Sequence, residues 1–167
     1  MSENKINLRR VGIFTQQSEH QIYDFLQQWF IPHGIEMSWL EEGFKNKDDL
    51  DLVISFGGDG TVLAALSLFP QCPVLAVNFG NVGFLTAGDR EELADMLKSV
   101  LNGNFIISER SVLKCEHAHG VDYAVNEIVI RGATKLIAVE LSINDQHIRR
   151  VRGDGVIIGT ATGSTAY

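Results

Sequence analysis

The chain has 167 residues, of which 45% are hydrophobic and 21% are charged. This composition is typical of a soluble globular protein with a buried core, and no apolar stretch approaches the length of a membrane span. The formal net charge of −7 argues against a nucleic-acid partner, because binding along a duplex needs clustered Lys and Arg. The N-terminus has no apolar segment after its first charges, so we expect a cytoplasmic protein without a membrane partner.

Short apolar runs and amphipathic segments alternate over the first hundred residues. Buried strands are predicted at residues 11–14, 52–56 and 74–77. Helices are predicted after a capping box of Ser18 and Gln21, over 62–69, and from Asp89 to Gly103 with Glu92 completing a second capping box. Pro32 is expected to end the first helix. The alternation predicts a parallel sheet with helices on both faces.

The pattern changes near residue 104. Short or alternating apolar runs then predict strands at 112–115, 123–130, 136–143, 148–151 and 156–158. The Asn144-Asp145 pair predicts a tight hairpin, because both residues tolerate positive φ. We therefore expect an α/β domain over residues 1–104, followed by an incomplete antiparallel all-β domain over residues 105–167.

A glycine loop, Gly57-Gly58-Asp59-Gly60-Thr61, connects a predicted buried strand to a predicted helix. Glycines let the backbone turn sharply and approach phosphate oxygens, while the N–H groups that open the helix point at the anion. Asp59 would repel phosphate unless it accepted a proton from an attacking hydroxyl or held Mg²⁺. From spacing alone, the alternative is a tight turn whose Asp caps the helix.

Other candidate residues are ambiguous when taken singly. Asn126-Glu127 could mark a strand turn, and Arg152 with Asp154 could be a surface ion pair beside a hairpin glycine. His117 and His119 alternate on one strand face, but they lack a third ligand, so we predict no protein metal site.

In order along the chain, these segments resemble the NAD kinases. The Gly-Gly-Asp-Gly-Thr loop is shared by a superfamily that also includes diacylglycerol-type lipid kinases and, more distantly, phosphofructokinases. The later segments resemble NAD kinases in particular: Asn78-x-Gly80-x-x-Gly83-Phe84-Leu85-Thr86, Ser108-Glu109-Arg110 with Leu113, Asn126-Glu127, Arg152-Gly153-Asp154-Gly155 and Thr160–Tyr167.

The resemblance implies an enzyme that transfers a phosphoryl group from ATP, or from polyphosphate, to the 2′-hydroxyl of the adenosine ribose of NAD, giving NADP. Mg²⁺ or another divalent cation would accompany ATP. The family is usually oligomeric, which implies a homo-oligomer. The α/β domain would bind the phosphates, and the β domain would form the NAD side of the cleft.

Roles for individual residues also follow from the resemblance. Asp59 would be the catalytic base. The expected phosphate-binding residues are Gly57, Gly58, Gly60 and Thr61. The expected NAD-binding residues are Asn126, Glu127, Lys135 (a weaker match), Arg152, Asp154, Thr165, Ala166 and Tyr167.

This sequence departs from the family pattern in two ways. Ala161 stands where the family usually has Pro, from which we expect a modest loosening of the loop. The family's chain continues past the position of Tyr167, so we expect little or no activity from the 167 residues alone. The alternatives are a nucleotide-binding fragment that does not turn over and a lipid-kinase-like enzyme that acts on a long-chain alcohol.

Overall fold

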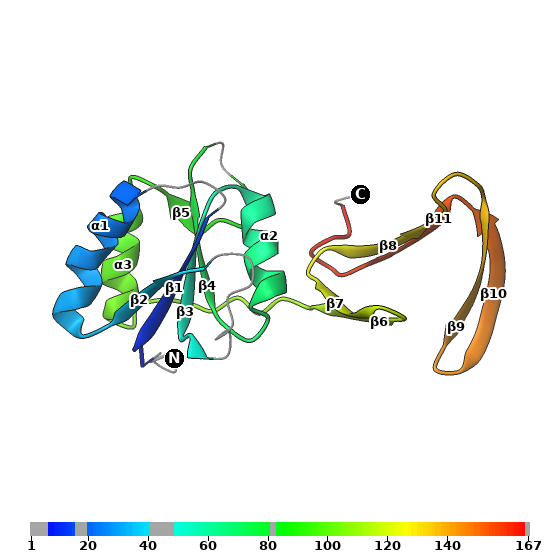
Figure 1. Ribbon diagram of the computed structural model, residues 1–167, viewed down its shortest axis with the longest axis horizontal. Helices are drawn as coiled ribbons and strands as arrows, with labels where there is room; N and C mark the ends of the chain where they lie inside the picture. Colours follow the sequence, from blue (N-terminus) through cyan, green and yellow to red (C-terminus); the bar gives the residue numbers. More distant parts are fainter. Residues whose placement is uncertain (1–6, 16–19, 41–48, 81–82, 166–167) are drawn as a thin grey trace. The chain divides into compact units, whose positions relative to one another are not determined.

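The computed structural model describes residues 7–15, 20–40, 49–80 and 83–165. The chain divides into two compact units, Met1–Glu109 and Arg110–Tyr167. The first unit contains a parallel sheet with helices, and the second contains antiparallel strand pairs (Figure 1). The predicted fold class is therefore confirmed.

The first unit is built on one five-stranded parallel sheet. Its strands, in the spatial order β2-β1-β3-β4-β5, have the bounds β2 Glu36–Trp39, β1 Arg10–Thr15, β3 Leu52–Phe56, β4 Val74–Asn78 and β5 Gly88–Asp89. All five side chains of β3 are buried, as expected for a central strand that is covered on both faces. The three predicted strands are confirmed, whereas the two edge strands, β2 and β5, were not predicted.

Helices cover both faces of this sheet, as predicted. They are α1 (His20–Phe30), α2 (Asp59–Leu68) and α3 (Leu93–Leu101). In Figure 1, α1 and α3 lie on one face and α2 lies on the other. No helix in the described part of the chain is long and apolar enough to cross a membrane.

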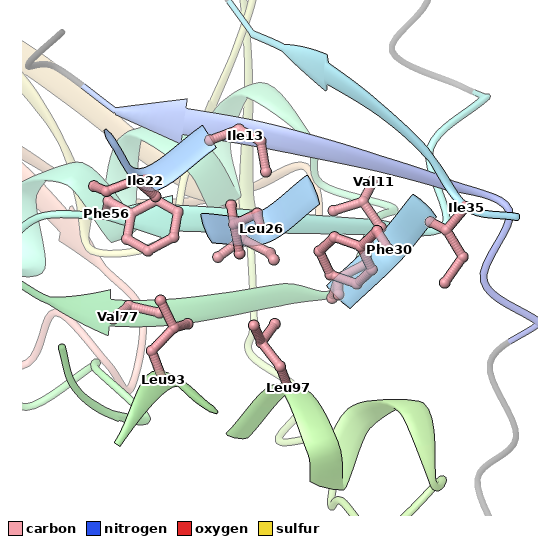
Figure 2. Close-up of a cluster of buried hydrophobic side chains, with 12 residues drawn as sticks. Val11, Ile13, Ile22, Leu26, Phe30, Ile35, Phe56, Val77, Leu93 and Leu97 are labelled. Atoms are coloured by element: carbon pink, nitrogen blue, oxygen red, sulfur yellow. The ribbon is translucent and has the colours of Figure 1, made fainter. Parts of the chain in front are cut away.

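Each face of the sheet has its own apolar core. Figure 2 shows the larger one, where side chains of α1 and α3 meet those of β1, β3 and β4. Its labelled members are Val11, Ile13, Ile22, Leu26, Phe30, Ile35, Phe56, Val77, Leu93 and Leu97. The smaller core, beside α2, consists of Leu40, Val53, Ala65 and Phe69. Complete burial of a Leu or Phe side chain contributes about 1.5–3 kcal/mol, so the two cores account for how the helices are held to the sheet.

The helix ends test the predicted capping signals. Ser18 lies outside the described residues. At α3, the Asp89 carboxylate accepts hydrogen bonds from the N–H groups of Glu91 and Glu92 (2.9 and 3.2 Å), and the Glu92 carboxylate accepts one from Asp89 N–H (3.1 Å). This reciprocal pattern confirms the second capping box, although regular helix begins only at Leu93. A 3₁₀ turn, Ile31–His33, contains Pro32 and follows α1 directly.

The second unit consists of three antiparallel strand pairs. Their bounds are β6 Leu113–His117 with β7 Gly120–Ala124, β8 Glu127–Arg131 with β11 Gly155–Gly159, and β9 Ile137–Ile143 with β10 Gln146–Gly153. The hairpin between β9 and β10 is confirmed, since Asn144 and Asp145 have φ values of 50° and 63°. The single strand predicted over 123–130 is wrong, because the chain breaks at Val125-Asn126 into β7 and β8.

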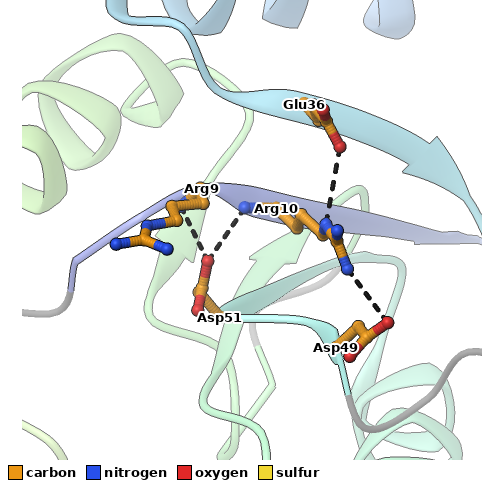
Figure 3. Close-up of polar contacts among 5 residues, drawn as sticks. All are labelled: Arg9, Arg10, Glu36, Asp49 and Asp51. Atoms are coloured by element: carbon orange, nitrogen blue, oxygen red, sulfur yellow. Dashed lines mark hydrogen bonds and ion pairs between the residues drawn. The ribbon is translucent and has the colours of Figure 1, made fainter.

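One carboxylate joins the amino ends of β1 and β3 (Figure 3). Asp51 Oδ2 accepts hydrogen bonds from the N–H groups of Arg9 (2.7 Å) and Arg10 (2.9 Å), and Asp51 N–H donates to the Arg10 carbonyl at 2.9 Å. The Arg10 guanidinium also lies 2.9 Å from Asp49 and 3.5 Å from Glu36, in a half-exposed position. Asp51 thus helps to fix β1 against β3 from the edge opposite the strands' carboxyl ends.

We expect Asp51→Ala to lower the free energy of unfolding by about 1–2 kcal/mol, because two backbone N–H groups lose their acceptor. Asp51→Asn keeps an acceptor oxygen and should cost less. Asp49→Ala removes only an exposed ion pair, so it should cost less than about 1 kcal/mol. Urea denaturation measures all three. Equal losses in Asp51→Ala and Asp49→Ala would contradict this account of the contact.

Candidate active site

The glycine loop begins where β3 ends. Gly57 has a φ of 153°, which residues with a side chain rarely adopt, and its N–H donates to the Val77 carbonyl at 3.0 Å. A Cβ at this position would collide with the Thr61 hydroxyl and would lie 2.8 Å from Thr61 Cβ. The turn from β3 into α2 therefore requires glycine at this position.

Helix α2 begins with backbone N–H groups that no N-cap side chain binds. Its N-cap, Gly58, is extended (φ −87°, ψ −172°) and makes no side-chain capping hydrogen bond, while its carbonyl accepts from Thr61 N–H at 2.9 Å. The helix thus begins at Asp59, three residues before the predicted start at Val62. A Cβ added at Gly58 or Gly60 would meet no atom within 4 Å in the part of the chain that the structure describes. These two glycines leave open space beside a helix N-terminus, where anions bind.

Asp59 does not cap the helix, so the alternative of a capping aspartate is wrong. Its carboxylate is held by the second glycine segment instead. Oδ2 accepts a hydrogen bond from Phe84 N–H and Oδ1 accepts one from Leu85 N–H, both at 3.0 Å. The contact joins two glycine-rich segments that lie more than twenty residues apart in the sequence.

The second glycine segment is itself shaped by Asn78, the last residue of β4. Asn78 is buried, with 3% of its surface exposed. Its side-chain N–H₂ donates to the Gly80 carbonyl (3.0 Å), and its Oδ1 accepts from Gly80 N–H (3.2 Å). Residues 81 and 82 lie outside the described residues. Both segments leave the carboxyl ends of neighbouring parallel strands, which is where open α/β sheets bind ligands.

In the second unit, the β8–β11 pairing brings together Asn126, Glu127 and the segment from Thr160. Gly159 pairs with Glu127, and Thr160 N–H donates to the Asn126 carbonyl at 2.8 Å. The buried Thr160 hydroxyl donates to the Val125 carbonyl and accepts from Gly163 N–H at 3.1 Å. Glu127 Oε2 is buried without a hydrogen-bond partner among the described residues. Such an oxygen needs a donor, and a ligand hydroxyl would supply one.

Three other expected NAD-binding residues, Lys135, Arg152 and Asp154, lie toward the opposite end of the same strand pair. Gly132 N–H donates to the Asp154 carbonyl at 3.0 Å, next to the pairing of Arg131 with Gly155. Exposed Arg152 lies on β10, and exposed Lys135 lies in the β8–β9 connection. Arg131, at this end of β8, is five residues from Asn126, which corresponds to about 17 Å along an extended strand. Thr165 is exposed, whereas Ala166 and Tyr167 lie outside the described residues.

Thr160→Val should lower the free energy of unfolding by about 1–3 kcal/mol, because it leaves the Val125 carbonyl and the Gly163 N–H without their shared partner. Thr160→Ser keeps the hydroxyl and is the matched control. Thermal and urea unfolding of both variants measure the difference. Equal stability of the two variants would show that the hydroxyl contacts do not hold this turn.

Cys72 has a strongly shifted pKa. Burial, together with the negative charge of Asp51, raises the pKa of its thiol to about 11. The thiol donates to the Leu50 carbonyl at 3.4 Å, just before the amino end of β4. It therefore lies at the edge of the sheet opposite Asp59, and we assign it no role in the site.

This pKa predicts slow alkylation of Cys72. At pH 8 the thiol is almost wholly protonated, so iodoacetamide should modify it about a hundredfold more slowly than a free cysteine with a pKa near 8.5. The rate should rise with pH until the pH approaches 11. Measuring the reaction in a Cys115→Ser variant isolates Cys72. A rate equal to that of free cysteine at pH 8 would contradict the shift.

The fold and the glycine loop together define an α/β protein with a candidate phosphate-binding site at the carboxyl ends of its parallel strands. Residues 12–105 match the family model of the ATP-NAD kinase N-terminal domain, and residues 125–167 match that of the ATP-NAD kinase C-terminal domain. The chain therefore belongs to the NAD kinase family. This confirms the resemblance and overturns the lipid-kinase alternative.

Curated relatives agree with this assignment. The chain is 39% identical over 123 residues to the NAD kinase of Methanothermobacter thermautotrophicus, covering 71% of this chain and 44% of that protein. It is 32% identical over 167 residues to the NAD kinase of Thermomicrobium roseum, covering 95% of this chain and 58% of the relative. The chain thus spans about half the length of these relatives.

Solved structures have the same fold. Yeast NADH kinase complexed with NADH matches with a TM-score of 0.79 at 24% identity, covering 96% of this chain and 60% of that one. An NAD kinase from Archaeoglobus fulgidus in complex with ATP matches with a TM-score of 0.72 at 26% identity, covering 95% of this chain and 63% of that one.

Proposed function

We propose that the protein containing this chain is an NAD kinase, which transfers the γ-phosphoryl group of ATP, or a phosphoryl group of polyphosphate, to the 2′-hydroxyl of the adenosine ribose of NAD. The observation that carries the proposal is the Asp59 carboxylate, held in place at an open helix N-terminus. The substrates are proposed because the chain belongs to the NAD kinase family.

The phosphate groups would lie against Gly57, Gly58, Gly60 and Thr61. Two features support this placement. No atom of the described residues lies within 4 Å of the place where Gly58 or Gly60 would carry a Cβ, which leaves space for a ligand to approach the backbone. The N-terminus of α2 has no side-chain cap, so its N–H groups and dipole can act on a bound anion.

Asp59 would act as the general base. Each of its oxygens already accepts one backbone N–H, and each has a second lone pair with which to accept the ribose hydroxyl. As the 2′-oxygen forms its bond to the γ-phosphorus, the hydroxyl proton moves to the carboxylate. The bond from the γ-phosphorus to the bridging oxygen breaks, and ADP leaves with its electron pair.

NAD recognition is assigned to the second unit. Glu127 Oε2, which has no hydrogen-bond partner among the described residues, and the adjacent Asn126 amide are suited to the hydroxyls of a ribose. Further contacts are assigned to Lys135, Arg152, Asp154, Thr165, Ala166 and Tyr167. Because the first three lie toward the end of the β8–β11 pair that is opposite Asn126, they would contact a different part of an extended dinucleotide.

A divalent cation such as Mg²⁺ would accompany ATP and neutralise charge on its phosphates. Within the described ranges, no three His, Cys, Asp or Glu side chains are grouped so that they could hold a metal. The cation would therefore be held mainly by the triphosphate oxygens and by water. Asp59, in the glycine loop, would be the carboxylate nearest to them.

Residues 1–104 would be the phosphate-binding domain, and residues 105–167 would be part of the domain that binds NAD. The protein would act in the cytoplasm as a homo-oligomer in NADP biosynthesis, with no nucleic-acid or membrane partner.

Asp59→Asn in the complete protein should lower kcat for NADP formation by about 10²–10⁴-fold, the range that a general base contributes. NAD affinity, measured by calorimetric titration, should stay near that of the wild type. Asp95→Asn, on the exposed part of α3, is the matched control and should keep full activity. An Asp59→Asn variant with wild-type kcat would contradict the base assignment. A wild-type protein that forms no NADP from NAD with either donor would contradict the kinase proposal.

A further inference from the structure

The second glycine segment holds Asp59 through its backbone, and one of its residues makes that contact possible by having no side chain. We propose that Gly83 is a positioning residue for Asp59, because only glycine at position 83 lets the N–H groups of Phe84 and Leu85 hold the carboxylate in a single orientation. The inference rests on the proposed function, in which Asp59 is the base.

The two hydrogen bonds fix more than the position of the carboxylate. They go to different oxygens, Phe84 N–H to Oδ2 and Leu85 N–H to Oδ1, each at 3.0 Å. A single bond would leave the group free to rotate about Cβ–Cγ, whereas two consecutive donors also set its plane. The remaining lone pairs of Asp59 therefore point in fixed directions.

A side chain at position 83 would occupy the space of that carboxylate. A Cβ built on Gly83 collides with Asp59 Oδ1 and lies 2.8 Å from Cγ and 3.3 Å from Oδ2. The group that must move is the end of a short side chain, and Gly83→Ala should therefore displace the carboxylate without unfolding the protein.

Gly80 and Gly163 show that this effect is specific. A Cβ on Gly80, in the same segment, would meet no atom of the described residues within 4 Å. A Cβ on Gly163 would collide with the Asn126 main chain, which cannot rotate away. Gly80→Ala is therefore a matched control that adds the same methyl group to the same segment and leaves Asp59 in place.

Displacement of a base by about 1 Å lowers the rate of the chemical step by about a hundredfold, while binding made by other residues is unaffected. A merely structural role for Gly83 would lower the melting temperature and the fraction of folded enzyme, which lowers the apparent kcat and leaves KM unchanged. A loss of kcat per mole of folded enzyme, at an unchanged melting temperature and with faster exchange at the two amides, therefore distinguishes positioning from folding.

The experiment compares wild type, Gly83→Ala, Gly80→Ala and Asp59→Asn in the complete protein. It measures kcat and KM for NAD, thermal stability, and hydrogen exchange at the amides of Phe84 and Leu85. We expect Gly83→Ala to lower kcat about a hundredfold with KM and melting temperature near those of wild type. Gly80→Ala should behave as wild type. Exchange at both amides should accelerate in Gly83→Ala and in Asp59→Asn.

Two results would overturn the inference. One is a Gly83→Ala variant with wild-type kcat, and the other is unchanged exchange at Phe84 and Leu85 in both Gly83→Ala and Asp59→Asn. The exchange measurement does not depend on catalysis. If the wild type forms no NADP, the proposed function fails, and the exchange rates alone then decide whether Gly83 positions the carboxylate.

Discussion

The arrangement of the candidate active site depends on one interaction, the bidentate hydrogen bonding of the Asp59 carboxylate by two consecutive backbone N–H groups. It connects the start of α2 to the segment that follows β4. The sheet makes the contact possible, because β3 and β4 are parallel neighbours and both segments leave the same edge. The two cores on either side of the sheet keep β3 and β4 in that relation.

The glycines of the two segments have three different physical roles. Gly57 is required by its left-handed φ and its contact with Thr61, so its role is in folding. Gly58 and Gly60 have open space around them, which fits a ligand that approaches the backbone closely. Gly83 leaves room for a carboxylate. The glycines of the two segments therefore serve the fold, the binding of a ligand and the positioning of Asp59.

Much of the fold could be predicted from the sequence because it depends on local signals. The buried run of β3, the Asp89–Glu92 capping box and the Asn144-Asp145 hairpin each follow from residue type and spacing. Strand β2 escaped prediction because its half-buried residues form no apolar run, and β5 because it has only two residues. The start of α2 was placed too late because Gly58 and Gly60 disfavour helix, although a helix N-terminus tolerates them.

The site was only partly predictable. Asp59, Asn126 and Glu127 could be named because their side chains carry chemistry and match a family motif. The donors that hold Asp59 are the backbone N–H groups of Phe84 and Leu85. Almost every residue has a backbone N–H group, so the residue types at these positions do not reveal the contact. The unpartnered oxygen of Glu127 likewise depends on burial, which a single sequence does not specify.

The central claim is that the carboxylate of Asp59 takes the proton of a ribose hydroxyl. The most direct test is a crystal structure of the complete protein with NAD, Mg²⁺ and a non-hydrolysable ATP analogue. The account predicts an Asp59 oxygen within about 2.6–3.2 Å of the 2′-oxygen of the adenosine ribose, with the hydrogen bonds from Phe84 and Leu85 retained. A bound NAD whose 2′-hydroxyl faces another residue, with Asp59 bonded only to the backbone, would contradict it.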